Sequence, residues 1–307
     1  MGGPSGEHDI SLKSGHGVVE ALARGRWPVE PLVIPHDCDV EGARRWTQQA
    51  LSVSHPDVVF IALHGTFGED GTVQQVCDEL HLAYTGSDAL ASRLGMDKVA
   101  SRQRFEAAGL CVPRWGVMET GRRSVRLPAG IAYPIVVKPI SEGSSLGVSM
   151  VGRSEQLALA LAEAGRYGAR VLIEEFIRGR ELTVGILGEE ALPVIEIRPT
   201  HPFFDFTAKY TPGSTDYLVP APIDAQAASA AQAAARTAHA ALGCRHLSRT
   251  DLILSQDGRM VVLEINTIPG FTPMSLLPKA AACFDLSYDA LCERLALMAA
   301  RELAAHG

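Results

Sequence analysis

Two spacings of apolar residues alternate along the first part of the chain. Residues 11–24 and 41–53 follow the helical period, with apolar positions gathered on one side. Short β-type apolar runs cover residues 29–34 and 57–63. Such an alternation of helices and strands is typical of an α/β lobe with a parallel sheet.

The remaining chain continues the mixture of elements. A strand, a Gly/Ser-rich loop and a second strand are predicted over residues 133–151. Further strands are predicted at 170–177 and 181–187, and helices near 97–109, 155–164, 224–243 and 287–305. Residues 199–223 show little regular pattern, and an irregular stretch of this length is usually a lid or binding loop.

The composition is ordinary for a soluble globular protein, with 47% hydrophobic and 21% charged residues. The formal charge is −7, and no basic run is long enough to form a phosphate-binding stripe, which argues against nucleic acid as the main ligand. The six cysteines are widely spaced, without a Cys-x-x-Cys pair, and are predicted to be reduced. With no signal-peptide pattern and no long apolar span, we expect a cytoplasmic protein that does not contact a membrane.

The polar residues of greatest chemical interest lie in a predicted hairpin within residues 249–271. Asp257 and Gly258 separate two apolar runs, which is a strong signal for a two-residue turn. Counting outward from this turn pairs Gln256 with Arg259, Leu254 with Val261, Leu252 with Leu263, Asp251 with Glu264, and Arg249 with Asn266. Because side chains alternate along strands, the last two pairs share one face.

Asp251 and Glu264 would then face each other about 5 Å apart and repel. A cation between them would remove this repulsion, and two carboxylates with the amide oxygen of Asn266 are hard ligands that suit Mg2+ carrying phosphate oxygens. A solvated hairpin end with salt-bridged charges is the alternative. The hairpin alone leaves both interpretations open.

Lys138 interrupts an apolar strand, which destabilises the fold unless an anion or carboxylate meets the ammonium. The Gly/Ser loop that follows, residues 143–147, offers backbone N–H groups and hydroxyls with little bulk, as a phosphate cover requires. It is not a P-loop, because the Gly-Lys-Ser/Thr sequence and the following helix are missing. The residues alone also allow a merely flexible loop, and Lys98 in the preceding helix, read alone, is a solvated lysine.

Two more polar groups follow apolar strands. His64, with Glu69 nearby, lies in a glycine-rich loop at a carboxyl strand end, where parallel sheets bind ligands. Glu174 and Glu175 end one strand and Glu181 opens the next, and acceptors beside an apolar slot suit adenine and ribose. A structural histidine and an ordinary polar strand end are the alternatives.

Several segments occur together in a specific order over nearly the whole chain: GEHDISLKSG, ALHGTFGEDGTVQ, YTGS, MDK, VVKPISEGSSLGVS, LIEEF, AKY, RTDLIL and LEINTIPGFTPMSLLPK. Each is weak evidence alone, except the last, which is highly specific. In this order they resemble the D-alanine–D-alanine ligases of the ATP-grasp superfamily.

This resemblance implies a three-lobed α/β ATP-grasp fold with ATP between the central and C-terminal lobes. It places a Rossmann-like substrate lobe at 1–91, a central lobe at 92–177, and a C-terminal lobe with lid and metal site at 178–307. The implied reaction joins two D-alanine molecules to D-alanyl-D-alanine through an acyl phosphate, for peptidoglycan precursor and cell-wall synthesis. A homodimer is expected from the family.

The resemblance also implies residue roles. Nucleotide contacts fall to Lys98, Lys138, Ser144, Ser145, Glu174, Glu175, Phe176, Ile177, Glu181, Lys209 and Asn266. Two Mg2+ or Mn2+ ions would be held by Asp251, Glu264 and Asn266. Catalytic roles fall to Glu7, Ser144, Tyr210, Arg249 and Gly270. Substrate contacts fall to Glu7, His64, Ser275 and Leu276.

In this scheme Arg249 and the Gly270 N–H stabilise the oxyanion of the tetrahedral intermediate. Glu7 pairs with the ammonium of the first D-alanine, and residues 275–276 receive the carboxylate of the second. Tyr210 closes the lid.

The start of the chain departs from the family pattern. Relatives carry an apolar strand directly before the Gly-Gly turn, whereas Met1 precedes Gly2 and Gly3 here. We therefore expect an N-terminal lobe without its first strand, with unpaired edges and uncovered apolar surface between residues 29–34 and 58–63. We also expect that the natural protein starts upstream.

Other functions remain as alternatives. The second hypothesis is a related ligase that takes D-serine or D-lactate as second substrate, but Lys209 and Tyr210 favour an amine nucleophile. Phe204 and Phe206 replace lid residues that are often tyrosine in relatives. A truncated nucleotide-binding protein with little activity is the third hypothesis, and the intact polar set of the hairpin argues against it.

Overall fold

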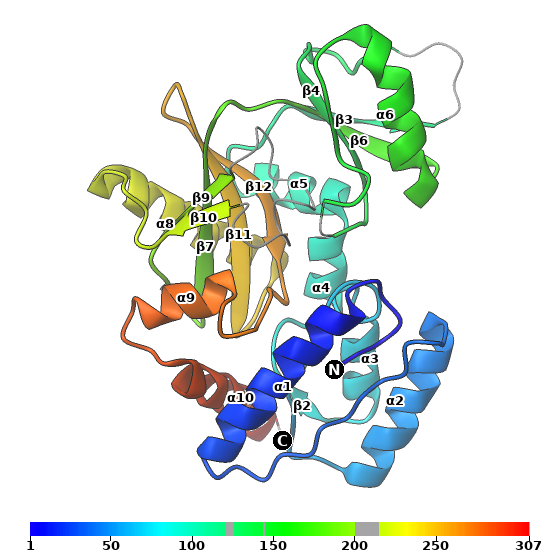
Figure 1. Ribbon diagram of the computed structural model, residues 1–307, viewed down its shortest axis with the longest axis vertical. Coiled ribbons are helices and arrows are strands. Elements are labelled where there is room, and N and C mark those ends of the chain that lie inside the picture. The colour runs from blue at the N-terminus through cyan, green and yellow to red at the C-terminus, as the bar shows by residue number, and fades with distance from the viewer. Residues whose placement is uncertain (121–125, 144, 200–214, 307) are drawn as a thin grey trace.

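The chain forms three lobes, each with a sheet of its own (Figure 1). This computed structural model describes residues 1–120, 126–143, 145–199 and 215–306. Their strands form a two-stranded parallel sheet and two antiparallel sheets of four and six strands. The expected α/β class is confirmed.

The N-terminal lobe holds the parallel pair. Its elements are α1 (His8–Arg24), α2 (Val40–Ser54), β1 (Val58–Val59), α3 (Thr72–Glu79), β2 (Ala83–Tyr84) and α4 (Ala89–Met96). The side chain of Asp39 caps α2 by accepting from Gly42 N at 2.7 Å, and Asp88 caps α4 by accepting from Ala91 N at 2.8 Å. The two helices predicted at 11–24 and 41–53 are therefore present.

The strand predicted at residues 29–34 does not form. Ile34 forms a parallel bridge with Gly2, and its N–H donates to Met1 O at 2.9 Å, while Leu32 O accepts from the Met1 ammonium at 3.0 Å. The strand predicted at 57–63 is reduced to β1. A strand needs a continuous ladder of backbone partners, and residues 1–3 supply only a short one. A cavity of about 660 Å3 with apolar lining, including Val29, Leu32 and Phe60, lies between these segments.

The central and C-terminal lobes carry the antiparallel sheets. The central sheet has the order β3-β6-β4-β5 and the C-terminal sheet β10-β9-β7-β11-β12, with β8 beside β7. The central elements are β3 (Trp115–Glu119), β4 (Ile135–Pro139), β5 (Ser149–Val151), η1 (Ser154–Gln156), α6 (Leu157–Ala164), η2 (Gly165–Tyr167) and β6 (Arg170–Glu175). The C-terminal elements are β7 (Gly179–Leu187), β8 (Glu190–Ala191), β9 (Ile195–Pro199), β10 (Thr215–Leu218), α8 (Ala225–Leu242), β11 (Leu247–Ser255), β12 (Met260–Asn266) and α9 (Leu276–Ala282).

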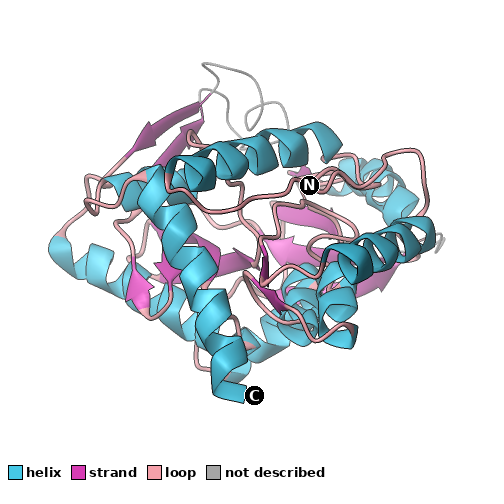
Figure 2. Ribbon diagram, turned by 90° about the horizontal axis from the view of Figure 1, so that it is seen from below, coloured by secondary structure: helices cyan, strands magenta, loops and turns pink. Residues whose placement is uncertain are grey.

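Two helices connect the lobes. Helix α5 (Lys98–Ala107) packs against β12 and α8, while α10 (Tyr288–His306) packs against α1 and the β1–β2 pair. Seen from below, α10 crosses the near face of the molecule and ends at the C label (Figure 2). No helix in the described part of the chain is long and apolar enough to cross a membrane.

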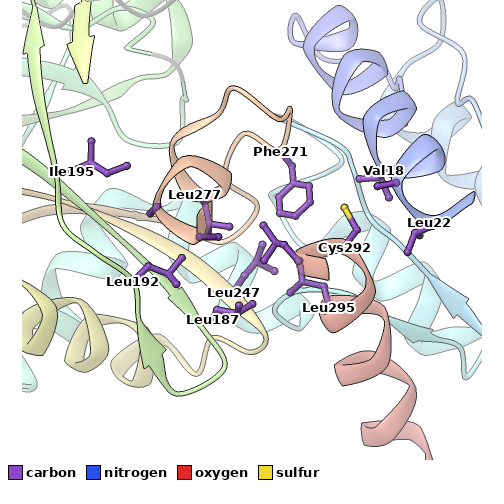
Figure 3. Close-up of a cluster of buried hydrophobic side chains, with 14 residues drawn as sticks. Val18, Leu22, Leu187, Leu192, Ile195, Leu247, Phe271, Leu277, Cys292 and Leu295 are labelled. Carbon is purple, nitrogen blue, oxygen red and sulfur yellow. The ribbon is translucent and has the colours of Figure 1, made fainter. Parts of the chain in front are cut away.

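One hydrophobic core joins the N-terminal and C-terminal lobes (Figure 3). Val18 of α1 and Leu295 of α10 contribute to the same cluster as Leu187 and Leu247 of the large sheet. Leu187 and Leu295 are completely buried. This shared core fixes α1, and the loop before it, relative to β11.

Candidate active site

A cavity of about 510 Å3 lies between the central and C-terminal lobes. Its lining contains many of the residues that the sequence assigns to nucleotide or metal: Lys98, Lys138, Ser145, Glu174, Glu175, Phe176, Ile177, Glu181, Asp251 and Glu264. They come from a helix, a loop and strands of both antiparallel sheets. Folding therefore brings together residues separated by more than 160 positions in the chain.

Lys98 contacts the residue that precedes the Gly/Ser loop. It opens α5, whose N-terminus is capped by Asp97 through bonds from Val99 N and Ala100 N. The Lys98 ammonium donates to the carbonyl oxygen of Glu142 at 2.5 Å. Burial lowers the pKa of Lys98, and Glu264 opposes this shift. The interpretation of Lys98 as a solvated lysine is therefore wrong.

Lys138 meets the carboxylate that its place in an apolar strand requires. Its Nζ lies 2.5 Å from Oε2 of Glu174, and the other oxygen of Glu174 accepts from Arg102 Nε at 2.7 Å. All three side chains are at least nine-tenths buried. The sequence reading missed Arg102, although it follows Lys98 by four residues and so shares its helix face.

The end of β6 has two different carboxylates. Unlike Glu174, Glu175 turns to Arg114, accepting from its backbone N at 3.0 Å and from its Nε at 2.9 Å. The backbone N–H of Phe176 donates to Pro134 O at 3.2 Å. The nucleotide roles assigned to these glutamates stay predictions. Ser144, Lys209 and Tyr210, together with Phe204 and Phe206 of the lid, lie outside the described residues.

The hairpin has the predicted pairing at its polar end. Arg249 lies opposite Asn266 and Asp251 opposite Glu264, so these four residues share one face. The prediction that the two carboxylates are direct cross-strand neighbours is confirmed.

The pairing predicted near the turn is wrong by one residue. Leu252 faces Val262 and Leu254 faces Met260, because the ladder shifts between Asp251 and Leu252. Ser255 N donates to Arg259 O at 2.9 Å, which leaves a three-residue loop whose last residue, Gly258, has φ +85°. A glycine in this conformation is typical of three-residue hairpin loops. The bulge after Asp251 restores the predicted register at the polar end.

Asp251 is held from two sides. Arg249 donates to both of its carboxylate oxygens, at 3.0 and 2.9 Å, and Thr183 Oγ1 donates to Oδ1 at 2.6 Å. Thr183 lies opposite Asp251 on β7 and is buried, and the sequence reading missed it. Burial lowers the pKa of Arg249, but the Asp251 carboxylate outweighs it and the net shift is upward. Arg249 is therefore a fixed cation beside the paired carboxylates.

The polar hairpin residues fit a hard divalent cation. Asp251 and Glu264 place two carboxylates on neighbouring strands, and Asn266 adds an amide oxygen on the same face. In the described part of the chain, no three His, Cys, Asp or Glu side chains form a metal-binding group. A cation here would therefore use two carboxylates with the amide, and with oxygens of a bound ligand.

The loop after β1 lies against the start of α1. His64 is buried, with Nε2 3.0 Å from Ser14 Oγ and Nδ1 3.5 Å from Oε1 of Glu69. Burial raises the pKa of Glu69, the hydrogen bond with His64 opposes the rise, and the Glu7 carboxylate adds to it. His64 is thus held by the fold, and a contact with substrate stays a prediction.

Glu7 and Gly270 are not among the lining residues of the nucleotide cavity, and each contacts a residue of another assigned segment. A Cβ on Gly65 would lie 2.7 Å from Oε2 of Glu7, so the carboxylate rests directly on that glycine. A Cβ on Gly270 would lie 3.2 Å from the hydroxyl of Ser275, which also accepts from Thr272 N at 3.0 Å. Ser275 precedes α9, and Leu276 is its first residue.

Two family models match the chain. The one described as D-ala D-ala ligase N-terminus matches residues 38–87, and the one described as D-ala D-ala ligase C-terminus matches residues 104–296. The chain belongs to the D-alanine–D-alanine ligase family. The predicted resemblance is confirmed, and the family is one of ATP-dependent ligases.

Individual relatives cover the chain almost completely. The D-alanine–D-alanine ligase of Geotalea uraniireducens (strain Rf4) is 40% identical over 99% of this chain and 95% of its own length. That of Syntrophotalea carbinolica (strain DSM 2380 / NBRC 103641 / GraBd1) is 43% identical over 96% of this chain and 93% of its own. The similarity therefore includes all three lobes.

Solved structures have the same fold. The Bacillus anthracis D-alanine–D-alanine ligase complexed with ATP superimposes with a TM-score of 0.84 at 29% identity, covering 100% of this chain and 98% of its own. The VanG D-Ala:D-Ser ligase of Enterococcus faecalis gives 0.82 at 31% identity, with 97% of each chain covered.

Proposed function

We propose that this chain catalyses the ATP-dependent ligation of two D-alanine molecules to D-alanyl-D-alanine through an acyl phosphate, for peptidoglycan precursor synthesis. The observation that carries the proposal is the 40–43% identity to D-alanine–D-alanine ligases over 96–99% of the chain. The D-Ala:D-Ser ligase, at 31% identity, is as similar as the Bacillus anthracis D-alanine–D-alanine ligase, at 29%, so the choice of second substrate rests on the 40–43% identical relatives, which are named D-alanine–D-alanine ligases. D-alanine is therefore favoured as the second substrate.

ATP would bind in the cavity between the central and C-terminal lobes. Lys98 and Lys138 line this cavity, and phosphoryl transfer depends on positioning and on neutralising phosphate charge. Phe176, Ile177 and Glu181 also line the cavity; Phe176 and Ile177 would form an apolar wall for adenine, and Glu181 would bind the ribose. In the reaction, a carboxylate oxygen of the first D-alanine takes the γ-phosphoryl group and ADP leaves.

Asp251, Glu264 and Asn266 would hold two Mg2+ or Mn2+ ions. Their oxygen ligands and shared strand face support this assignment. Bound there, the ions would neutralise the phosphate charge during transfer. Thr183 and Arg249 keep the Asp251 carboxylate in place.

Other assigned residues would bind the two amino-acid substrates. Glu7 would pair with the ammonium of the first D-alanine, and the place of its carboxylate beside Gly65, next to His64 in the chain, supports this role. The amine of the second D-alanine attacks the acyl carbon, and the tetrahedral intermediate then expels phosphate. Arg249 and the Gly270 N–H are the proposed oxyanion donors.

Ser275 and Leu276 precede and begin α9, where backbone N–H groups favour the carboxylate of the second D-alanine. Ser144, Lys209 and Tyr210 keep the cover and lid roles that the family resemblance implies.

A cytoplasmic location and a homodimer complete the proposal. All six cysteines are free, which suits a reducing compartment. The homodimer rests on the family resemblance, and sedimentation equilibrium of the purified chain would measure it.

The direct test is a substrate matrix. Purified protein is incubated with ATP, Mg2+ and D-alanine, L-alanine, D-serine or D-lactate, singly and in pairs, while phosphate release is followed and products are identified by mass. We expect D-alanyl-D-alanine as the main product, with one phosphate released per dipeptide. Phosphate release without any dipeptide or ester would contradict the proposal.

A further inference from the structure

Three buried charges join α5 to the nucleotide cavity. Arg102 is completely buried, and its Nε donates to Oε1 of Glu174 at 2.7 Å. Its Nη2 lies 2.5 Å from the same oxygen as a close ion pair. The second oxygen of Glu174 lies 2.5 Å from Nζ of Lys138. Glu174 thus shares one carboxylate between a cation inside the protein and a cation on the cavity wall.

The charge count gives Arg102 a specific effect on the cavity. Lys138 and Glu174 alone would be a neutral pair, and the lysine would offer little net attraction to an anion. With Arg102 included, the three groups carry one net positive charge. Because Arg102 does not line the cavity, this charge faces the ligand through Lys138.

The protonation states support this count. Burial alone raises the pKa of Glu174, but Arg102 and then Lys138 outweigh it, so the net shift is downward and the carboxylate stays ionised. Arg102 and Lys138 also lower the pKa of Lys98, after burial itself. The charge of Arg102 therefore acts on Lys98 as well as on Glu174.

The geometry also restricts the position of Lys138. A lysine side chain is flexible and loses considerable rotamer freedom when it is fixed. Glu174 can fix Lys138 only if its own carboxylate is fixed. Arg102, which lies one turn after Lys98 in α5, holds this carboxylate. Removing a partner from a buried charge cluster is strongly destabilising, so this arrangement is maintained by the fold.

We propose that Arg102 is a positioning residue of the nucleotide site, which orients Lys138 through Glu174 and keeps the cavity wall at Lys138 positive towards the polyphosphate of the nucleotide. This inference rests on the proposed use of ATP. It predicts an effect on phosphate recognition that a purely structural salt bridge would not produce.

The test compares Arg102→Met with Arg102→Lys and with Arg104→Met, a control on the same helix whose side chain is exposed. Calorimetry measures binding of ADP and of adenosine, both with Mg2+, to each folded variant. Arg102→Met should weaken ADP binding at least tenfold and adenosine binding less than threefold. Arg102→Lys should recover most of the loss, and Arg104→Met should bind as the parent does.

Kinetics give a second readout. In Arg102→Met, KM for ATP should rise at least tenfold, while KM for D-alanine changes less than twofold. The double variant Arg102→Met/Glu174→Gln has no carboxylate to neutralise Lys138, so it should regain part of the ADP affinity. If Arg102→Met does not fold, the double variant and Arg102→Lys carry the comparison.

Equal loss of ADP and adenosine binding, or lower melting temperature with unchanged ADP affinity, would overturn the proposal. Failure of the proposed ligase function is distinguishable, because nucleotide binding is measured without D-alanine. A parent protein that binds ADP but makes no dipeptide would contradict only the ligase function. A parent protein that does not bind ADP would contradict both.

Discussion

Glu264→Gln tests the paired carboxylates by removing one charge while keeping nearly the same shape. Glu264 and Asp251 lie directly opposite each other on adjacent strands. At about 5 Å and an effective dielectric constant of about 20, two like charges repel by about 3 kcal/mol. A divalent cation that binds both must overcome this repulsion and gains attraction from each carboxylate. Loss of one carboxylate should therefore weaken cation binding substantially.

The protein without metal should respond much less. The variant relieves repulsion from Asp251 but also loses the attraction of Glu264 to Arg249 and Lys98. These effects oppose each other, so we expect a change of only a few degrees in melting temperature. Turnover at fixed Mg2+ should fall at least about 100-fold. A loss of about 1.4 kcal/mol of transition-state stabilisation slows a reaction tenfold, so this fall corresponds to about twice that energy.

The assay measures phosphate release as a function of Mg2+ concentration, with melting curves at zero and saturating Mg2+. Glu155→Gln is the charge-matched control, because Glu155 is exposed and its contacts are local, with Arg153 at 3.9 Å and Ser154 Oγ at 3.1 Å. Near-normal turnover with an unchanged Mg2+ dependence in Glu264→Gln would refute the metal assignment. Unfolding of the variant in the absence of metal would refute the expectation that the relieved repulsion and the lost attraction nearly cancel.

Three further variants test the fold around the site. Leu295→Ala should lose about 2–5 kcal/mol in urea unfolding, because Leu295 is completely buried, whereas Leu297→Ala, on the exposed side of α10, should change stability by less than about 1 kcal/mol. Burial lowers the pKa of His239 to about 4, so the folded protein binds a proton at this side chain less readily than the unfolded chain does. The stability that His239 contributes is therefore fully present above the ordinary pKa of histidine and is lost as pH falls towards 4. Between pH 7 and 5, His239→Gln should lose about 1–2 kcal/mol less stability than the parent protein. Gly258→Ala should destabilise by about 1–2 kcal/mol because Gly258 has φ +85°, while Gly152→Ala, where a Cβ meets only ordinary contact, should cost less.

The hairpin illustrates what the sequence can predict about the site. Alternation along two strands was enough to place Arg249 with Asp251 and Glu264 with Asn266 on one face of each strand, because side-chain direction follows the strand period. The pairing of Asp251 with Glu264 was counted from the turn, and it holds because a bulge restores the register. The turn was predicted with two residues and has three, since an Asp-Gly signal does not distinguish these loop lengths. The bulge compensates for the extra loop residue, and it depends on packing that a local pattern does not describe.

The sequence wrongly predicted a strand at residues 29–34 and missed the contact of Arg102 with Glu174, and both errors have a different cause. An apolar run predicts the tendency to form a strand, but the strand itself needs a partner, and here Ile34 forms only a bridge with Gly2. Arg102 and Glu174 are 72 positions apart, and no spacing rule connects them. Local sequence patterns do not show which distant residues become partners, and this limited the prediction of both the sheet and the site.

Charge balance explains why the carboxylates of the hairpin belong with the lysines of the cavity. The charged residues that line the cavity, with Arg102 and Arg249 behind them, comprise six cations and seven carboxylates: Lys98, Arg102, Lys138, Arg180, Arg198 and Arg249 with Glu142, Glu174, Glu175, Glu181, Glu196, Asp251 and Glu264. These side chains carry no net positive charge to neutralise a polyphosphate, so divalent cations are needed for charge compensation. In Glu264→Gln the protein itself gains one positive charge while cation binding weakens. ADP should consequently bind that variant at least as tightly as the parent without Mg2+, and Mg2+ should improve its binding less.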